Sequence, residues 1–361
     1  MSTNATERTG MIVALPPHER ADESVARIMW TVVLALLPAT IAGVWFYGIR
    51  AVVVTVTAVV AAVAVEHFIV RYMLKRDTTT VTDGSAVVTG MLLAFNLPAS
   101  IPLWQLVLGA IVAIGIGKMA FGGLGNNPFN PALVGRAFML ISFPVEMTHW
   151  PVPGVARMSM NLSAVTGATP LGVAKDAIDR GLATADLPSY LDLFLGNIGG
   201  SLGEVSAVAL ILGGLFLIWR GYIPWAVPPA FLLGIAVVTG IAWVVDPGAY
   251  IDPLYHILAG GAMLGAWFMV TDMTTTPMSL KGRVVFAVAA GVITGLIRLF
   301  GGFPEGVSYS ILIMNAFVPV IDRHLKPRKF GYGKPKNTAR ATAATGGTTT
   351  TGGTTTTGGA S

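Results

Sequence analysis

The residues best suited to chemistry lie in one short segment, Ser163-Ala164-Val165-Thr166-Gly167-Ala168-Thr169-Pro170. This segment is rich in hydroxyls and small side chains, and it lies in the longest polar loop of an otherwise apolar chain. Threonine followed by proline is a favourable pair for a helix N-cap and first turn, so the pattern predicts a turn and a helix that begins at Pro170. The flexible backbone at Gly167 and Ala168 also suits an accessible hydroxyl, which covalent attachment would need. The two readings are compatible.

The composition of the chain indicates a membrane protein. Of its 361 residues, 53% are hydrophobic and only 11% are charged, and the mean hydropathy is +0.70. Soluble domains carry roughly 25% charged residues, so lipid must replace water around much of this surface. The net charge of +5 needs no nucleic-acid partner, because membrane proteins retain lysine and arginine on the cytoplasmic side.

Cysteine is absent from the sequence. This excludes disulfides, thiolate zinc sites and cysteine-ligated iron–sulfur clusters within the chain. The five histidines are scattered, which argues against haem or copper. Flavin is the redox cofactor that remains open.

The hydrophobic pattern predicts an all-α integral membrane protein with about ten crossings. A helix needs about 20 apolar residues to span the hydrocarbon. Shorter runs with Gly, Asn or Pro at their ends are expected to be half-helices completed by irregular backbone inside the protein. The long candidates are 28–47, 50–70, 102–121, 224–245, 283–300 and 306–322, and the short ones are 84–97, 131–144, 205–219 and 255–270.

The distribution of charge predicts the orientation. With the N-terminus in the cytoplasm, most short loops rich in lysine and arginine fall on that side, and Arg50 is the main exception. The long loop 145–204 holds three basic and six acidic residues, a net charge of −3. We therefore expect Thr169 to face outward. The basic residues assigned to the cytoplasmic side are Arg71, Lys75, Arg76, Lys118, Arg220, Lys281, Arg283 and the stretch 323–329.

Two stretches of the chain resemble each other. Gly90-Met91-Leu92-Leu93 leads to Phe121-Gly122-Gly123-Leu124, and Gly261-Ala262-Met263-Leu264 leads to Phe300-Gly301-Gly302-Phe303. Five spans in each half make this an inverted repeat, a plan on which many transporters build a central pathway. Chance similarity between glycine-rich apolar segments is the alternative.

These patterns divide the chain into five parts. No secretory signal is apparent, so we expect an uncleaved cytoplasmic N-terminus. Threonine, glycine and alanine repeats near the C-terminus cannot bury apolar area and predict a disordered tail. The parts are an N-terminal segment (1–27), a first membrane repeat (28–144), an outer loop (145–204), a second membrane repeat (205–325) and a cytoplasmic tail (326–361).

Several charged residues have two possible roles. Asp83-Gly84-Ser85 and Asp272-Met273-Thr274 border short spans, where a carboxylate can cap a helix or bind Na⁺ or a proton. Capping is the simpler prediction for both. Glu66 is expected at the membrane interface, and snorkelling accounts for Arg136 and Arg298 near span ends. Pairing with a phosphate or a carboxylate is the alternative for Arg136.

The runs Gly122-Gly123-Leu124-Gly125-Asn126-Asn127-Pro128-Phe129-Asn130-Pro131-Ala132 and Thr166-Gly167-Ala168-Thr169-Pro170-Leu171, with the ten-span pattern, identify a family. They resemble the D subunits of Rnf ion-translocating oxidoreductases, which are similar in turn to the B subunits of sodium-pumping NADH:quinone reductases. The resemblance covers roughly residues 20–326.

By this resemblance, a flavin transferase attaches flavin mononucleotide (FMN) to Thr169 through a phosphodiester bond, with Thr166, Gly167 and Ala168 completing the site. The family's transferase works outside the cytoplasmic membrane. The resemblance also implies a component of a ferredoxin- or NADH-dependent pump in the inner membrane, with A, B, C, E and G subunits as partners and Na⁺ or H⁺ as the transported ion. It permits a second, non-covalent flavin such as riboflavin, and it implies no metal ligands.

One position departs from the family pattern. Flavinylated relatives generally carry an acidic residue three positions before the first motif hydroxyl, where this chain has Ser163. Thr166 is the nearest rival acceptor, and an unmodified loop is the other alternative. A non-redox channel or solute transporter would explain everything except the Thr-Gly-Ala-Thr segment, and a purely structural anchor is a third possibility.

Overall fold

The computed structural model describes residues 23–76, 80–151, 153, 166–167, 169–179, 187–204, 206–248, 250–301 and 306–326. All of them belong to one compact unit, Ala21–Lys326. Most of the expected N-terminal segment and nearly all of the expected tail lie outside the described residues.

The described part of the chain is mainly helical, and five helical stretches are long and apolar enough to cross a membrane. This confirms the prediction of an all-α membrane protein. Two of the five stretches continue past an α-helix into a π- or 3₁₀-turn. The five are α1 (Val25–Tyr47), α2 with its π-turn η1 (Ile49–Phe68 and Ile69–Met73), α4 to η3 (Leu103–Gly115 and Met119–Phe121), α10 (Val227–Val245) and α13 (Leu280–Phe300).

Three shorter apolar helices lie between the long ones: α3 (Ser85–Phe95), α5 (Pro131–Ser142) and α9 (Ala207–Trp219). A three-residue 3₁₀ turn, η2 (Val81–Asp83), precedes α3. The last helix is α14 (Val307–His324). The predicted short spans 84–97, 131–144 and 205–219 are therefore helices at nearly those bounds.

The predicted span 255–270 is not one helix. The structure divides it into α11 (Pro253–Leu258), α12 (Ala262–Leu264) and a π-turn, η5 (Gly265–Met269). Gly260 and Gly261 separate the pieces with φ angles of 67° and 68°. Glycine adopts this left-handed conformation readily because it has no Cβ, so two consecutive glycines end one helix and start the next.

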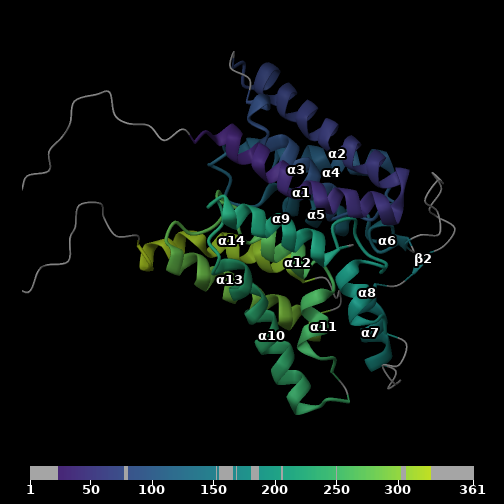
Figure 1. Cartoon of the computed structure of the whole chain (residues 1–361). Helices are drawn as coiled ribbons and strands as arrows, with labels where there is room; N and C mark the ends of the chain where they lie inside the picture. Colours follow the sequence, from purple (N-terminus) through teal and green to yellow (C-terminus); the bar gives the residue numbers. More distant parts are fainter. Residues whose placement is uncertain are drawn as a thin grey trace, which may run out of the picture. The chain divides into compact units, whose positions relative to one another are not determined.

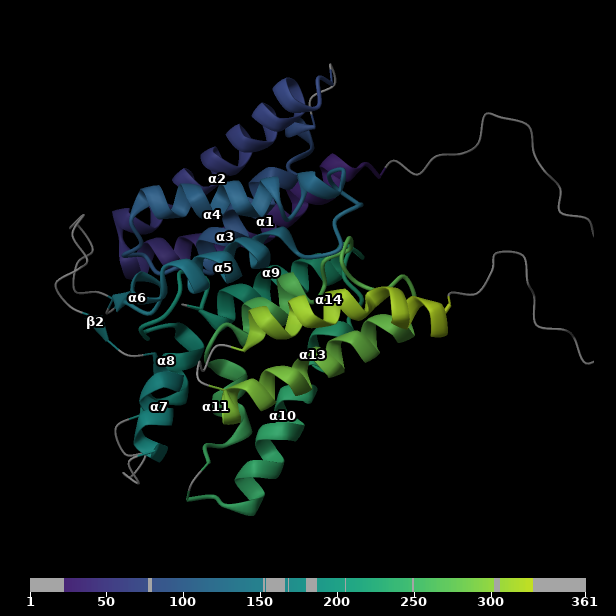
Figure 2. The same ribbon diagram turned by 180° about the vertical axis from the view of Figure 1, so that it is seen from behind.

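The region that follows α5 forms a small separate layer of short elements. Figures 1 and 2 show α6, α7 and α8 close together on one side of the helices. The elements are α6 (Pro144–Met147), β1 (Trp150–Pro151), β2 (Thr166–Gly167), α7 (Pro170–Asp179) and α8 (Tyr190–Leu195). The two strands pair antiparallel, with Trp150 opposite Gly167 and Pro151 opposite Thr166.

The long helices pack against neighbours in their own half of the chain. α2 packs against α3 and α4, and α10 packs against α13. Glycines allow the closest approaches, as at Gly234 and Gly291, whose Cα atoms would lie 2.9 Å from a Cβ built on the opposite residue. α1 and α9 join the halves side by side, as both views show (Figures 1 and 2).

Apolar side chains cover much of the outside of the long helices. Trp45, Val56, Leu233 and Val285 are each about half exposed or more. A water-soluble protein would bury such residues, whereas a lipid environment accommodates them. The outer surface therefore supports a multi-pass membrane protein.

The snorkelling prediction for two arginines is wrong. Arg136 and Arg298 are each only 4% exposed. Arg136 donates to Oδ1 of Asn96 at 2.6 Å, and Arg298 donates to the carbonyls of His256, Ala259 and Gly260. Arg298 thus binds carbonyls at the end of α11, which have no partner within the helix, and Arg136 binds the side chain of the residue that follows α3.

Candidate functional site

Thr169 lies at the start of α7, where it caps the helix. Its Oγ1 accepts a hydrogen bond from the amide of Gly172 at 3.1 Å, and its carbonyl accepts from the amide of Val173 at 2.9 Å. Helix α7 begins at Pro170, where the missing amide proton costs no hydrogen bond. The predicted cap and first-turn pair is confirmed.

Helix α7 is held against the neighbouring elements. Leu171 and Ala174 belong to a small buried apolar cluster with Leu193 of α8 and Tyr255 of α11. Lys175 donates to the carbonyl of Gly301. In this position Thr169 is only 5% exposed. The accessible hydroxyl expected from the sequence is therefore covered while α7 is docked.

The other residues of the predicted flavin site are described only in part. Thr166 and Gly167 form strand β2. Ser163 and Ala168 lie outside the described residues. The structure thus brings Thr169 next to β2 and the start of α7, and it leaves the roles of Thr166 and Ala168 as predictions.

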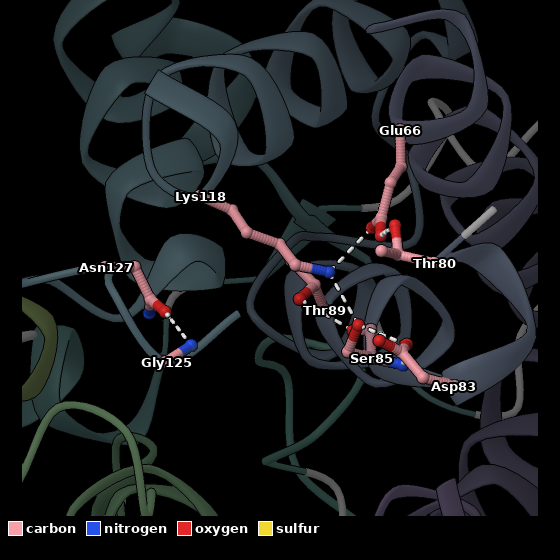
Figure 3. A network of polar contacts seen from close by, with 8 residues as sticks. All are labelled: Glu66, Thr80, Asp83, Ser85, Thr89, Lys118, Gly125 and Asn127. Atoms are coloured by element: carbon pink, nitrogen blue, oxygen red, sulfur yellow. Dashed lines mark hydrogen bonds and ion pairs between the residues drawn. The ribbon is translucent and has the colours of Figure 1, made fainter. Parts of the chain in front are cut away.

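A second polar site lies inside the helices of the first half, and the sequence analysis missed it. Nζ of Lys118 lies 2.6 Å from Oε2 of Glu66 and 2.6 Å from Oγ of Ser85 (Figure 3). Lys118 is 2% exposed and Glu66 is 0% exposed. Whether Glu66 lies at the depth of the membrane interface stays a prediction, but its carboxylate is enclosed by protein in a buried ion pair.

This ion pair is the centre of a longer chain of hydrogen bonds (Figure 3). The hydroxyl of Thr80 donates to Oε1 of Glu66 at 2.7 Å. On the other side, the amide and the hydroxyl of Ser85 both donate to Oδ1 of Asp83, at 2.8 Å and 2.5 Å. Asp83 thus caps the start of α3, as predicted, and it also connects to Lys118 through Ser85.

A cavity adjoins the ion pair. Its atom-free space is about 780 Å³, including its opening. One wall is apolar and is formed by α1, α3, α9 and η5, with Trp267 and Phe268 among its residues. The polar residues of its lining are Ser85, Thr89, Lys118, Asn127, Asn130, Thr271, Asp272 and Thr274.

Asp272 connects the two halves on the polar side of this cavity. Its carboxylate accepts hydrogen bonds from the amide and hydroxyl of Thr274 and from the hydroxyl of Thr275. The amide group of Asn130 lies 3.5 Å from its Oδ2. Burial raises the pKa of Asp272, and the hydrogen bonds from the two threonines act against this shift. The predicted role of Asp272 as a helix cap is wrong, because its carboxylate closes a turn between η5 and α13, and Ser279 is the residue that caps α13.

Near α7 and α8, Tyr190 donates a hydrogen bond to Asp252 at the start of α11. This hydrogen bond raises the pKa of Tyr190 to about 12, and burial and the carboxylate charge act in the same direction. Among the described residues, no cluster of three or more His, Cys, Asp or Glu side chains could hold a metal ion.

A model of the NQR2, RnfD, RnfE family matches residues 12–331. The chain belongs to this family. It is 45% identical to the D subunit of the proton-translocating ferredoxin:NAD(+) oxidoreductase complex of Clostridium ljungdahlii over 324 residues, covering 88% of this chain and 96% of that protein.

Two further relatives have similar names. The D subunit of the Na(+)-translocating ferredoxin:NAD(+) oxidoreductase complex of Acetobacterium woodii is also 45% identical, over 92% of this chain and 98% of that protein. The D subunit of the ion-translocating oxidoreductase complex of Halorhodospira halophila is 39% identical, over 90% and 97%. The two relatives at 45% are named for different ions, so identity to them does not decide which ion this family member transports.

Proposed function

We propose that this chain is the D-type membrane component of an ion-translocating electron-transport complex of the ferredoxin:NAD⁺ oxidoreductase type. It relays electrons through FMN bound covalently to Thr169, and the relay is coupled to transport of Na⁺ or H⁺. One combined observation carries the proposal: the family match extends over residues 12–331, and the motif hydroxyl of Thr169 lies at the start of a helix.

The start of α7 suits a phosphate ester. A helix N-terminus presents unpaired amides and the positive end of the helix dipole, both of which favour an anion. The amide of Gly172 already donates to Oγ1 of Thr169, the oxygen that would carry the phosphate. Because Thr169 is 5% exposed, loading requires its side chain to leave the docked position. When bound, FMN supplies one- and two-electron transfer, while the protein sets its position and potential.

The cavity beside Lys118 suits the second, non-covalent flavin. Its apolar wall of Trp267, Phe268 and neighbouring aliphatic residues matches a flat ring, and a few placed polar groups are what fixes a ligand's orientation in such pockets. Lys118, Asn127 and Asp272 would contact the polar edge of riboflavin. These residues provide both hydrogen-bond donors and acceptors.

The arrangement of helices supports ten crossings in two inverted repeats of five. The order α1, α2, α3, α4, α5 has a counterpart in α9, α10, α12 with η5, α13 and α14. The third member of each set starts after a glycine with positive φ, Gly84 in one and Gly261 in the other. Residues 28–144 and 205–325 are the two repeats, and 145–204 is the outer loop with the flavin.

The chain is not an enzyme alone. Partner subunits of the A, B, C, E and G types deliver and accept the electrons in the cytoplasmic membrane, and a flavin transferase loads the chain from outside. Both termini lie in the cytoplasm. A non-redox transporter on the same plan is the alternative, and the presence of bound flavin distinguishes the two.

In-gel ultraviolet fluorescence tests the attachment. The chain is produced with its transferase, denatured and compared with Thr169→Val and with Thr166→Val as the matched control. We expect fluorescence in the wild type and in Thr166→Val, and none in Thr169→Val. Fluorescence that persists in Thr169→Val would refute the assignment, and dark wild-type protein would favour the transporter.

A further inference from the structure

Helix α8 (Tyr190–Leu195) carries an apolar face in the segment between α5 and α9. Leu191 is 65% exposed, Leu195 50% and Phe194 39%. Leu191 and Leu195 are four positions apart, so they lie on the same side of the helix. Proteins rarely leave contiguous large apolar side chains open to water. This face therefore calls for an apolar partner.

The opposite side of α8 faces the protein. Leu193 is fully buried and belongs to the apolar cluster that contains Leu171 and Ala174 of α7. Because a helix turns by about 100° per residue, Leu193 points away from Leu191 and Leu195. Helix α8 is thus apolar on two sides. One side packs on α7, and no described residue covers the other.

Helix α8 lies beside the end of a long apolar helix. It packs against α9 and α11, as both views show for α11 (Figures 1 and 2). The rings of Tyr190 and Tyr255 are 6.2 Å apart, and Tyr190 donates to Asp252, which caps α11. A Cβ built on Gly240 would lie 3.3 Å from Cγ of Pro253, so α11 begins beside the last turns of α10. These contacts place α8 near the depth at which α10 ends.

The exposed apolar surface continues from α8 to α10. Leu254 at the start of α11 is about half exposed, and Val244 and Val245 at the end of α10 are largely exposed. Helix α10 is long and apolar enough to cross a membrane, so its exposed apolar side chains face lipid. Trp243, also partly exposed, is of the residue type enriched at the boundary between lipid and water. The open face of α8 therefore adjoins the lipid-facing surface at that boundary.

We propose that α8 is an interfacial helix, which inserts Leu191, Phe194 and Leu195 among the lipids at the membrane surface and thereby helps to hold α7 in place. A helix of this kind lies in the plane of the bilayer with its apolar side in the boundary between headgroups and acyl chains. The inference goes beyond the proposed function, because it holds whether or not a flavin is attached.

The lipid contact is apolar rather than electrostatic. Helix α8 contains no lysine or arginine, and the charged groups beside it, Asp192 and Asp252, are acidic. An anionic headgroup would be repelled by these carboxylates. The acyl chains of uncharged lipids are therefore the expected partner, and neither salt nor anionic lipid should strengthen the contact.

Spin labelling tests the insertion directly. The sequence contains no cysteine, so each single-cysteine variant of the full chain carries one nitroxide. In nanodiscs of uncharged lipid, collisions with oxygen, which concentrates among acyl chains, are compared with collisions with a water-soluble nickel complex. The variants are Leu191→Cys and Leu195→Cys, with Leu233→Cys on the exposed side of α10 as the lipid reference and Gly248→Cys in the exposed turn after α10 as the water reference.

We expect the labels at Leu191 and Leu195 to favour oxygen, as the label at Leu233 does, in the isolated chain and in the complete complex alike. Labels that favour the nickel complex, as at Gly248, would overturn the proposal. Labels that lose contact with both reagents in the complete complex would also overturn it, because a partner protein would then cover this face. A preference for oxygen that requires anionic lipid would contradict the apolar contact.

Hydrogen exchange in nanodiscs tests the effect on α7. Leu191→Ser/Leu195→Ser weakens the lipid contact without touching Leu193, so exchange in residues 170–179 should accelerate. The matched control is Leu212→Ser/Leu215→Ser, which removes two exposed leucines of α9 and should leave exchange in α7 unchanged. Equal exchange in wild type and the folded α8 variant would refute the role in holding α7. If the α8 variant does not fold, the spin labels still decide whether α8 inserts.

Discussion

At the scale of single residues, the buried Glu66–Lys118 pair is the feature that sequence reasoning did not find. The two residues are 52 positions apart, and no local pattern connects them. The sequence did contain an indication, because a glutamate inside a long apolar helix must either pair with a cationic group or be protonated. Its partner Lys118 lies near the end of the predicted span 102–121, where charge asymmetry indicates only a cytoplasmic position.

Removing either partner of this pair should destabilise the protein. Glu66→Gln leaves a buried ammonium, and single removal of a buried partner typically costs about 3–5 kcal/mol. Thermal unfolding in detergent measures the loss. The double variant Lys118→Met/Glu66→Gln should lose less stability than the sum of the losses in the two single variants. Losses that simply add would contradict the ion pair.

The Tyr190–Asp252 contact predicts a pH dependence. The pKa of Tyr190 is raised to about 12 by its hydrogen bond to Asp252, so the folded state favours the neutral phenol. The stabilisation is complete below the ordinary tyrosine pKa of about 10 and is lost as the pH rises through about 12.

Ultraviolet difference titration against Tyr190→Phe follows this ionisation. In Asp252→Asn, which keeps an acceptor for the start of α11, the midpoint should fall toward 10. An unchanged midpoint would show that the carboxylate does not control this tyrosine.

At the scale of elements, the start of α7 was predictable and its docking was not. Thr169-Pro170 is a local signal, and the structure has the expected cap. The burial of Thr169 depends on contacts of Leu171 and Lys175 with distant segments. Likewise, hydropathy located most helices. It did not reveal the break at Gly260 and Gly261, because two glycines leave the surrounding run apolar.

Loss of the cap should loosen α7. Thr169→Ala removes the acceptor for the Gly172 amide, and such substitutions cost about 1 kcal/mol. In protein made without the transferase, hydrogen exchange in residues 170–179 should accelerate. Thr169→Ser keeps the acceptor and should exchange like wild type. Equal protection in all three would contradict the cap.

The contact between α10 and α13 depends on small residues. A Cβ at Gly291 would lie 2.2 Å from the carbonyl oxygen of Phe231, so Gly291→Ala must separate the helices. We expect a lower unfolding temperature and less membrane-inserted protein. Gly115→Ala is the matched control, because its Cβ would meet only Ile69, at 3.8 Å. Similar behaviour of both variants would be evidence against this close packing.

At the scale of the whole molecule, composition and hydropathy predicted the membrane class, and the two motif runs, with the span pattern, carried the resemblance to the family that the match over residues 12–331 confirms. The cavity was not predictable, because its lining comes from α1, α3, α5, α9, η5 and the loops that connect the helices, which only the fold brings together.

The most direct test of the account is the mass of the intact chain isolated from a native complex. The account predicts a mass higher than that of the bare polypeptide by one FMN in phosphodiester linkage, with fragmentation placing the addition on Thr169. A bare chain in an active complex, or an addition on another residue, would contradict it.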